Sequence, residues 1–262
     1  MAGGPAANAA VTFRALGGNS CLVSSVGTGP LAATVLEDLE SYGVLVIDAT
    51  TDAGIGGPPV STVIVYTETG ERSVVSLNGM GRRLEGAYDP APFEPGVVLI
   101  DGHYSEFANQ SLSSLKSEVP VVMDAGSWKD HAESLLESAH AIICSEDFNP
   151  PNVGTEGIEA YLINRGATFV ATTRGANPVT WQTVDAAGIA RPPRVDAVDT
   201  SGAGDILHGA FAHAVASLGK KANAITTDDW VSCLTASLAI ASFSCRSFGT
   251  RSWIAELHGR QE

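Results

Sequence analysis

The residues best suited to chemistry lie in the run Asp-Thr-Ser-Gly-Ala-Gly-Asp from Asp199 to Asp205, directly before an apolar helical pattern. A glycine-containing turn that leads into a helix leaves backbone N–H groups unpaired where the helix dipole is positive, and such groups bind anions, phosphate above all. A carboxylate beside bound phosphate is electrostatically unfavourable, so its presence needs a reason. Asp205 would accept the proton of a hydroxyl that attacks phosphorus. The alternative is a plain helix cap in which Asp205 only interacts with the dipole.

A second pattern stands at the start of the chain, where Gly3-Gly4-Pro5-Ala6-Ala7-Asn8 precedes an expected helix over 9–16. Two glycines let a ligand approach the backbone closely, and the Asn8 amide offers both a donor and an acceptor to sugar hydroxyls. The alternative is an ordinary disordered start.

Polar residues also follow several expected strands, and the carboxyl ends of parallel strands are where α/β sheets bind ligands. Ser145 and Glu146 follow one such strand, and the turn Thr173-Arg174-Gly175 follows the next. A solvated loop acid and an ordinary turn are the alternatives. His103, in Asp101-Gly102-His103, would face a sugar or be an ordinary loop histidine, and Lys129 would neutralise phosphate or be a solvated lysine.

The elements that must position these residues alternate between strand and helix. Apolar runs bounded by helical patterns predict a parallel sheet covered on both faces, an α/β fold in one domain over residues 1–262. We expect strands over 22–26, 44–47, 97–100, 119–123, 141–144 and 168–172, and helices over 31–42, 105–116, 158–164, 203–218 and 228–243.

One segment departs from this alternation. Residues 61–67 and 72–77 alternate apolar and polar side chains around Glu68-Thr69-Gly70-Glu71, which predicts a β-hairpin with one solvated face. It is either a lid over an active site or a surface hairpin without a role.

Composition excludes several classes of protein. The 262 residues carry a formal net charge of −14, which disfavours nucleic acid and anionic membrane as partners. The four cysteines form no C-x-x-C pair, no signal peptide or membrane-spanning run is present, and a reducing cytoplasm is the expected location. Walker A, nucleophile-elbow and H-E-x-x-H motifs are absent from the sequence.

Taken together, the motif at 199–205 and the Gly-Gly start resemble the two signatures of PfkB-type carbohydrate kinases, the ribokinase-like family, and the resemblance extends along nearly the whole chain. It implies a three-layer sandwich with a mostly parallel central sheet and a small β lid. It also implies ATP-dependent phosphorylation of a sugar hydroxyl, with Asp205 as general base. The N–H groups of Gly202, Ala203 and Gly204 would stabilise the transferred group, and Gly3, Gly4 and Asn8 would contact the sugar.

The resemblance also implies cofactor contacts. Glu146 would reach Mg²⁺ through water, with Ser145 where the family usually has asparagine. Thr173 and Gly175 would touch the nucleotide, although Pro178 stands where the family often has a further glycine. Asp199 and Ser201 would hold a monovalent cation such as K⁺. The stretch from Cys245 to Gly249 would lie beside the nucleotide, and its carbonyl groups would help to hold the same ion. Cys245 is equally consistent with a buried, inert thiol.

Ketohexose-type members, including fructokinases, ketohexokinases and sulfofructose kinase, are the most similar, with a nucleoside kinase as the alternative substrate class. Family members often dimerise through the lid, which implies a homodimer here. They also carry a first strand, part of the lid and a sugar-binding aspartate before the Gly-Gly signature, whereas Met1 stands two residues before Gly3. We therefore expect that strand and part of the lid to be missing, leaving unpaired backbone groups. A non-catalytic protein that binds sugar or nucleotide is the alternative function.

Overall fold

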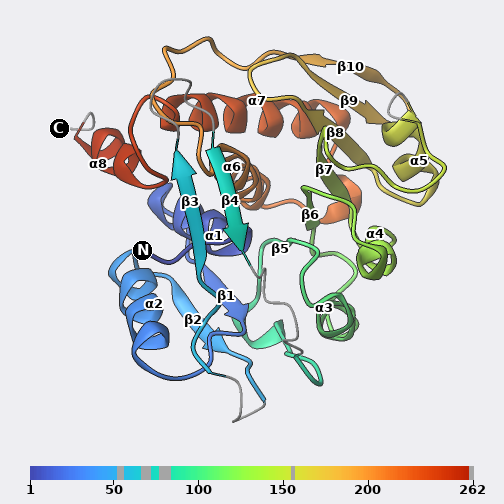
Figure 1. Ribbon diagram of the computed structural model, residues 1–262. Helices are drawn as coiled ribbons and strands as arrows, with labels where there is room; N and C mark the ends of the chain where they lie inside the picture. Colours follow the sequence, from blue (N-terminus) through green and yellow to red (C-terminus); the bar gives the residue numbers. More distant parts are fainter. Residues whose placement is uncertain (52–55, 66–71, 77–83, 155–156, 260–262) are drawn as a thin grey trace.

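Six strands form the central sheet of the computed structural model, which describes residues 1–51, 56–65, 72–76, 84–154 and 157–259 (Figure 1). The four strands from β5 to β8 are parallel, and β9 and β10 continue the sheet antiparallel. The expected mostly parallel sheet is thereby confirmed. The order across the sheet is β10 (Ala187–Ala190), β9 (Val179–Thr183), β8 (Phe169–Thr173), β7 (Ala141–Ser145), β6 (Val121–Ala125) and β5 (Val98–Ile100).

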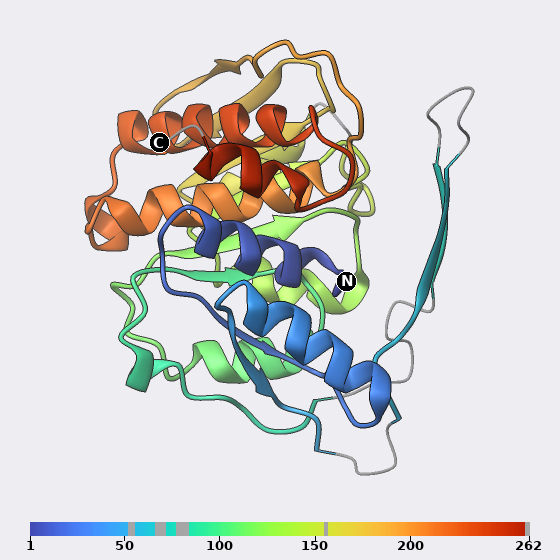
Figure 2. The ribbon, with the colours of Figure 1, turned by 90° about the vertical axis from the view of Figure 1, so that its left-hand side faces the viewer.

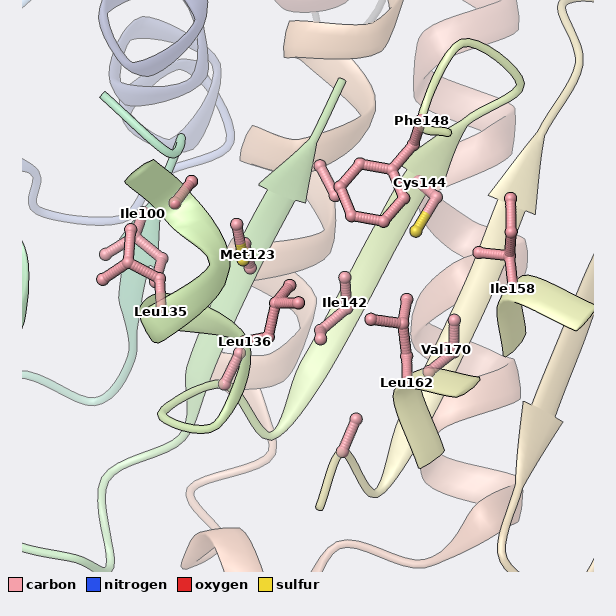
Figure 3. Close-up of a cluster of buried hydrophobic side chains, with 14 of the residues drawn as sticks. Ile100, Met123, Leu135, Leu136, Ile142, Cys144, Phe148, Ile158, Leu162 and Val170 are labelled. Carbon is pink, nitrogen blue, oxygen red and sulfur yellow. The ribbon is translucent and has the colours of Figure 1, made fainter. Parts of the chain in front are cut away.

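Helices cover both faces of this sheet, because alternate strand residues point to opposite sides. On one face Ile142, Cys144 and Val170 pack under α4 and α5 (Figure 3). On the other face Phe169 stacks on Phe211 and Trp230, with ring centroids 5.9 and 5.7 Å away. The helices of the first face are α3 (Ser105–Leu112), α4 (Glu133–Leu136) and α5 (Ile158–Asn164), and those of the second are α6 (Ala203–Ser217) and α7 (Thr227–Ser244).

A separate parallel pair, β1 (Cys21–Ser24) and β2 (Leu45–Asp48), lies beside the six-stranded sheet, with α2 (Pro30–Ser41) connecting its strands. Among the described residues, no strand pairs with the outer edge of β1 or of β5. A cavity of about 1140 Å³ lies between these elements and is lined by residues of both β1 and β5. The helices α1 (Pro5–Ala15) and α8 (Ser252–His258) pack with this pair.

The expected hairpin is present as β3 (Ser61–Val65) and β4 (Arg72–Ser76), with Ser61 opposite Ser76. Figure 2 shows that it stands away from the body of the protein. The expected turn and strand ends fall in the segments 66–71 and 77–83, which lie outside the described residues.

The structure also corrects some boundaries. Helix α1 begins at Pro5 rather than at residue 9, because Gly4 adopts a φ of 103° and the fixed φ of proline suits the first helical position. Asn8 is therefore a helical residue. Helix α3 ends at Leu112 rather than residue 116, and β9, β10 and α8 were not expected. Short 3₁₀ turns occupy Ala91–Phe93, Asp130–Ala132 and Ala222–Ala224.

No helix in the described part of the chain is long and apolar enough to cross a membrane. All four cysteines are free thiols, and Cys144 and Cys233 are buried, as their apolar neighbours in sequence predict.

Helix α7 begins with a capping box that makes its stability sensitive to pH. Thr226 and Asp229 exchange hydrogen bonds, and Lys220 lies 2.6 Å from Asp229. These bonds lower the pKa of Asp229 from 3.8 to about 2. A carboxylate whose pKa is lower in the folded than in the unfolded protein stabilises the fold at pH values above its unfolded-state pKa. This stabilisation is lost as the pH falls through its folded-state pKa.

We therefore expect Asp229→Ala to lower the melting temperature at neutral pH, because it removes the cap. The difference from wild type should shrink as the pH approaches about 2, and calorimetry across this pH range measures it. The control is Asp228→Ala, which removes an exposed carboxylate from the same turn but leaves the capping box intact. A pH-independent loss in Asp229→Ala would contradict the assignment.

Candidate active site

The turn before α6 has the geometry of an anion site. Gly202 caps the helix at a φ of 71°, and a Cβ atom there would lie 2.8 Å from Cγ2 of Thr250, so only glycine fits. Within the described residues, the N–H groups of Gly202 and Gly204 donate to no acceptor, whereas that of Ala203 donates to the Thr200 carbonyl at 3.2 Å. Two N–H groups at the positive end of a 15-residue helix are therefore available to a phosphate.

The sugar signature and the catalytic motif meet at Asn8. Its Nδ2 donates to Oδ2 of Asp205 at 2.7 Å, while its buried Oδ1 has no partner among the described residues. Buried amide oxygens are almost always hydrogen-bonded, so an unpartnered one is consistent with an acceptor kept for a ligand hydroxyl.

Helices α1 and α6 must approach closely for this contact to form. Gly209 lies against the backbone of α1, where an added Cβ would stand 2.4 Å from the Ala9 carbonyl oxygen. A side chain at this position would force the helices apart. Gly209 thus brings Asn8 to Asp205, a role that the sequence pattern alone did not show.

All the predicted sugar residues line the cavity between β1 and β5. Its lining includes Gly3, Gly4, Asn8 and His103, together with Asp101. Asn8 belongs to both the cavity wall and the Asp205 contact, so this residue connects the cavity to the motif at 199–205.

Several charges gather at the carboxyl ends of β5 and β6. Nδ1 of His103 lies 3.2 Å from Oδ1 of Asp101, an ion-pair contact without good hydrogen-bond geometry. This contact raises the pKa of His103, against the effect of burial. Burial alone would raise the pKa of Asp101, but His103 holds it below the ordinary value. Lys129 is half-buried near this pair, with Nζ 4.0 Å from where a Cβ of Gly102 would stand.

The candidate base has a raised proton affinity. Burial raises the pKa of Asp205 above its ordinary value, the hydrogen bond from Asn8 lowers it, and the nearby Asp124 carboxylate raises it. A base with a raised pKa holds an accepted proton more firmly, which suits proton transfer.

The predicted nucleotide residues meet where β7 and β8 end. Ser145 pairs with Thr173 in the sheet register, and the N–H of Glu146 donates to the Thr173 carbonyl at 3.0 Å. The Glu146 side chain is exposed, which leaves its carboxylate accessible to solvent and solutes. Gly175 has a φ of 56°, which glycine adopts readily.

The residues expected around a monovalent cation also come together. The Asp199 carboxylate accepts from the N–H groups of Ser201 and Gly249 at 2.8 and 2.9 Å. The Cys245 carbonyl accepts from the N–H groups of Val198 and Asp199. Here these groups fasten the turn before α6 to the segment after α7. Cys245 itself is buried, which raises the pKa of its thiol and agrees with the inert alternative.

Sequence reasoning missed a buried pair behind the motif. His208 lies one turn after Asp205 on α6, and its Nδ1 is 3.4 Å from Oδ2 of Asp124 at the end of β6. A polar residue in an otherwise apolar helix face was the available signal. Within the described residues, no three histidine, cysteine or acidic side chains converge on one metal position, so a direct side-chain metal cage is not seen there.

Gly209→Ala is expected to lower the free energy of unfolding by about 1–3 kcal/mol, because the added methyl group overpacks the α1–α6 contact. The sign of this change distinguishes a crowded from an uncrowded position, since a glycine-to-alanine change in an uncrowded helix interior raises the free energy of unfolding by about 1 kcal/mol. Urea denaturation measures the change. The control is Gly204→Ala in the same helix, where a Cβ has no neighbour within 4 Å. Unchanged stability of Gly209→Ala would show that the helices are not in this close contact.

Comparisons with known proteins identify the family of this chain. The family model described as pfkB family carbohydrate kinase matches residues 1–256. A deoxyribokinase from Salmonella typhi is 26% identical over 274 residues, covering 95% of this chain and 83% of its own length.

Two solved structures share the fold. A protein from Agrobacterium tumefaciens, provisionally described as a ribokinase, has a TM-score of 0.79 at 25% identity and covers 100% of this chain and 87% of its own. A fructokinase with bound ATP from Xylella fastidiosa has a TM-score of 0.75 at 17% identity, covering 99% and 91%. With its ribokinase-like fold and the family match over nearly all of its length, the chain belongs to the pfkB family of carbohydrate kinases.

Proposed function

We propose that this kinase transfers the γ-phosphoryl group of ATP to a hydroxyl of a sugar bound in the cavity between β1 and β5, with Asp205 as the general base. The observation that carries the proposal is the 2.7 Å hydrogen bond between Asn8 and Asp205, which joins the cavity wall to the anion-binding turn. A substrate in contact with Asn8 would have a hydroxyl beside the carboxylate.

In this mechanism Asp205 accepts the proton of the attacking hydroxyl as its oxygen bonds to phosphorus and the bond to ADP breaks. The N–H groups of Gly202 and Gly204 stabilise the charge that develops on the transferred group. The Ala203 N–H contributes only if it leaves the Thr200 carbonyl.

Metal ions belong to the proposal as well. Glu146 would hold Mg²⁺ through water, and the ion would neutralise phosphate charge. Asp199, Ser201 and the Cys245–Gly249 segment would border any monovalent cation such as K⁺, but their present hydrogen bonds already engage these groups, so no step is routed through one.

The sequence favours a ketohexose-like substrate, and the polar Asp101–His103 pair in the cavity suits sugar hydroxyls. Relatives named deoxyribokinase and ribokinase add pentoses to the candidates. A nucleoside is the second candidate class, because the cavity lining includes the aromatic residues Phe13, Tyr88, Phe93, Tyr104 and Phe107. An aromatic ring can stack on a nucleobase.

The hairpin β3–β4 is proposed as a lid. Its first residue, Ser61, and the preceding Pro58, Pro59 and Val60 line the cavity, while the strands extend beyond the body (Figure 2). A homodimer would form by pairing of two such hairpins.

Asp205→Asn is expected to lower kcat by roughly 10²–10⁴-fold, because the amide cannot accept the proton. ATP binding, measured by calorimetry, should be retained. Coupled assays of ADP release over ketoses, pentoses and nucleosides measure turnover and identify the substrate. Asp185→Asn, at an exposed position in the β9–β10 turn, is the matched control. Near-normal turnover by Asp205→Asn would refute its role, and failure of the wild type on every acceptor would favour a non-catalytic binding protein.

Asn8→Ala is expected to shift the acidic limb of the kcat/KM profile to higher pH. Only the ionised form of Asp205 accepts a proton, and the Asn8 hydrogen bond lowers the pKa of that carboxyl. Removal of the bond therefore raises the pKa, so activity is lost at a higher pH as the solution is acidified. Asn223→Ala, at an exposed site, should leave the limb in place. An unmoved limb in Asn8→Ala would contradict the contact.

A further inference from the structure

The side chain of His208 connects the first turn of α6 to the central sheet. It is only 5% exposed. Its Nδ1 lies 2.7 Å from the Gly204 carbonyl oxygen and 3.4 Å from Oδ2 of Asp124, and its Nε2 lies 3.2 Å from the carbonyl oxygen of Ile143 in β7. One buried ring thus reaches three structural elements.

Both ring nitrogens face oxygen atoms, and the two carbonyl oxygens can only accept hydrogen bonds. The bond to Ile143 therefore needs a proton on Nε2. Nδ1 lies against the Gly204 carbonyl and the Asp124 carboxylate. Asp124 and Ile143 are register partners in the sheet, so the carboxylate and the carbonyl are held at one level by the β6–β7 ladder.

We propose that His208 is a positioning residue for phosphoryl transfer: its bond to Ile143 fixes the Gly202–Asp205 turn against the end of β7. This inference rests on the proposed function. Glu146, the proposed outer ligand of Mg²⁺, follows Ile143 by three residues on the same strand exit. The His208–Ile143 bond therefore sets the distance between the base and anion site on α6 and the metal side of the site on β7. Phosphoryl transfer depends on such alignment, because a displacement of about 1 Å costs roughly 10²-fold in rate.

Two neutral variants separate the two bonds of His208. In His208→Gln the side-chain amide reaches the position of Nε2 and can still donate to Ile143. In His208→Asn the shorter amide occupies the position of Nδ1 and keeps only the bond to Gly204. Both variants replace the ring by a neutral amide, so the effect of losing the imidazole beside Asp124 is common to them.

We expect His208→Gln to retain kcat within a few-fold of wild type when the two are compared under saturating substrates. His208→Asn should lose about 10²-fold in kcat, with little change in KM for the sugar. Melting temperatures are measured alongside. Equal kcat values for the two variants, or a fall in melting temperature without a fall in kcat, would overturn the inference.

A nuclear magnetic resonance measurement tests the geometry without any activity. Long-range ¹H–¹⁵N spectra of histidine-labelled wild-type protein at neutral pH should show His208, assigned by its absence in His208→Gln, with Nε2 protonated. An unprotonated Nε2 would overturn the inference even in an active enzyme. If the wild type phosphorylates no acceptor, the proposed function fails, and the spectrum alone then decides whether His208 donates to Ile143.

Discussion

The site depends on the close packing of two helices that are almost 200 residues apart in sequence. Gly209 removes the side chain that would hold α1 and α6 apart, and the resulting approach places Asn8 on the Asp205 carboxylate. Glycine is normally unfavourable inside a helix by about 1 kcal/mol. Here the unfavourable helix propensity of Gly209 accompanies a close α1–α6 contact that no larger residue permits. This contact makes the cavity wall and the anion site neighbours.

Electrostatics sets a second constraint, because the chain is strongly acidic and the site itself contains the buried or half-buried carboxylates of Asp101, Asp124 and Asp205. Each carboxylate has a different compensation. Asp101 has the His103 imidazole, Asp124 has His208, and Asp205 has the Asn8 amide. Asp205 itself stands in the first turn of α6, beside the Gly202 and Gly204 N–H groups that face an external anion in the proposed function.

Local patterns predicted most of the fold, because parallel strands, glycine turns and helix starts depend on neighbouring residues. The motif at 199–205, the strands from β5 to β8 and the β3–β4 hairpin were predicted in this way. The start of α1 was misplaced because the helix-starting effect of Pro5 was outweighed by the apparent flexibility of two glycines. The roles of Gly209 and His208 could not be predicted, since each depends on an atom supplied by a distant segment: the Ala9 carbonyl and the Ile143 carbonyl.

The division of the sheet has a mechanical consequence. No hydrogen-bonded ladder in the described residues joins β1–β2 to β5, so side chains hold the two parts together. Arg251 is one of these links, since it bonds both Asp38 of α2 and the Ala2 carbonyl and lies over the Tyr42 ring. The cavity lies along this division and is lined by residues of both β1 and β5. A ligand that contacts both walls therefore links the two parts of the sheet, and its binding stabilises the folded protein.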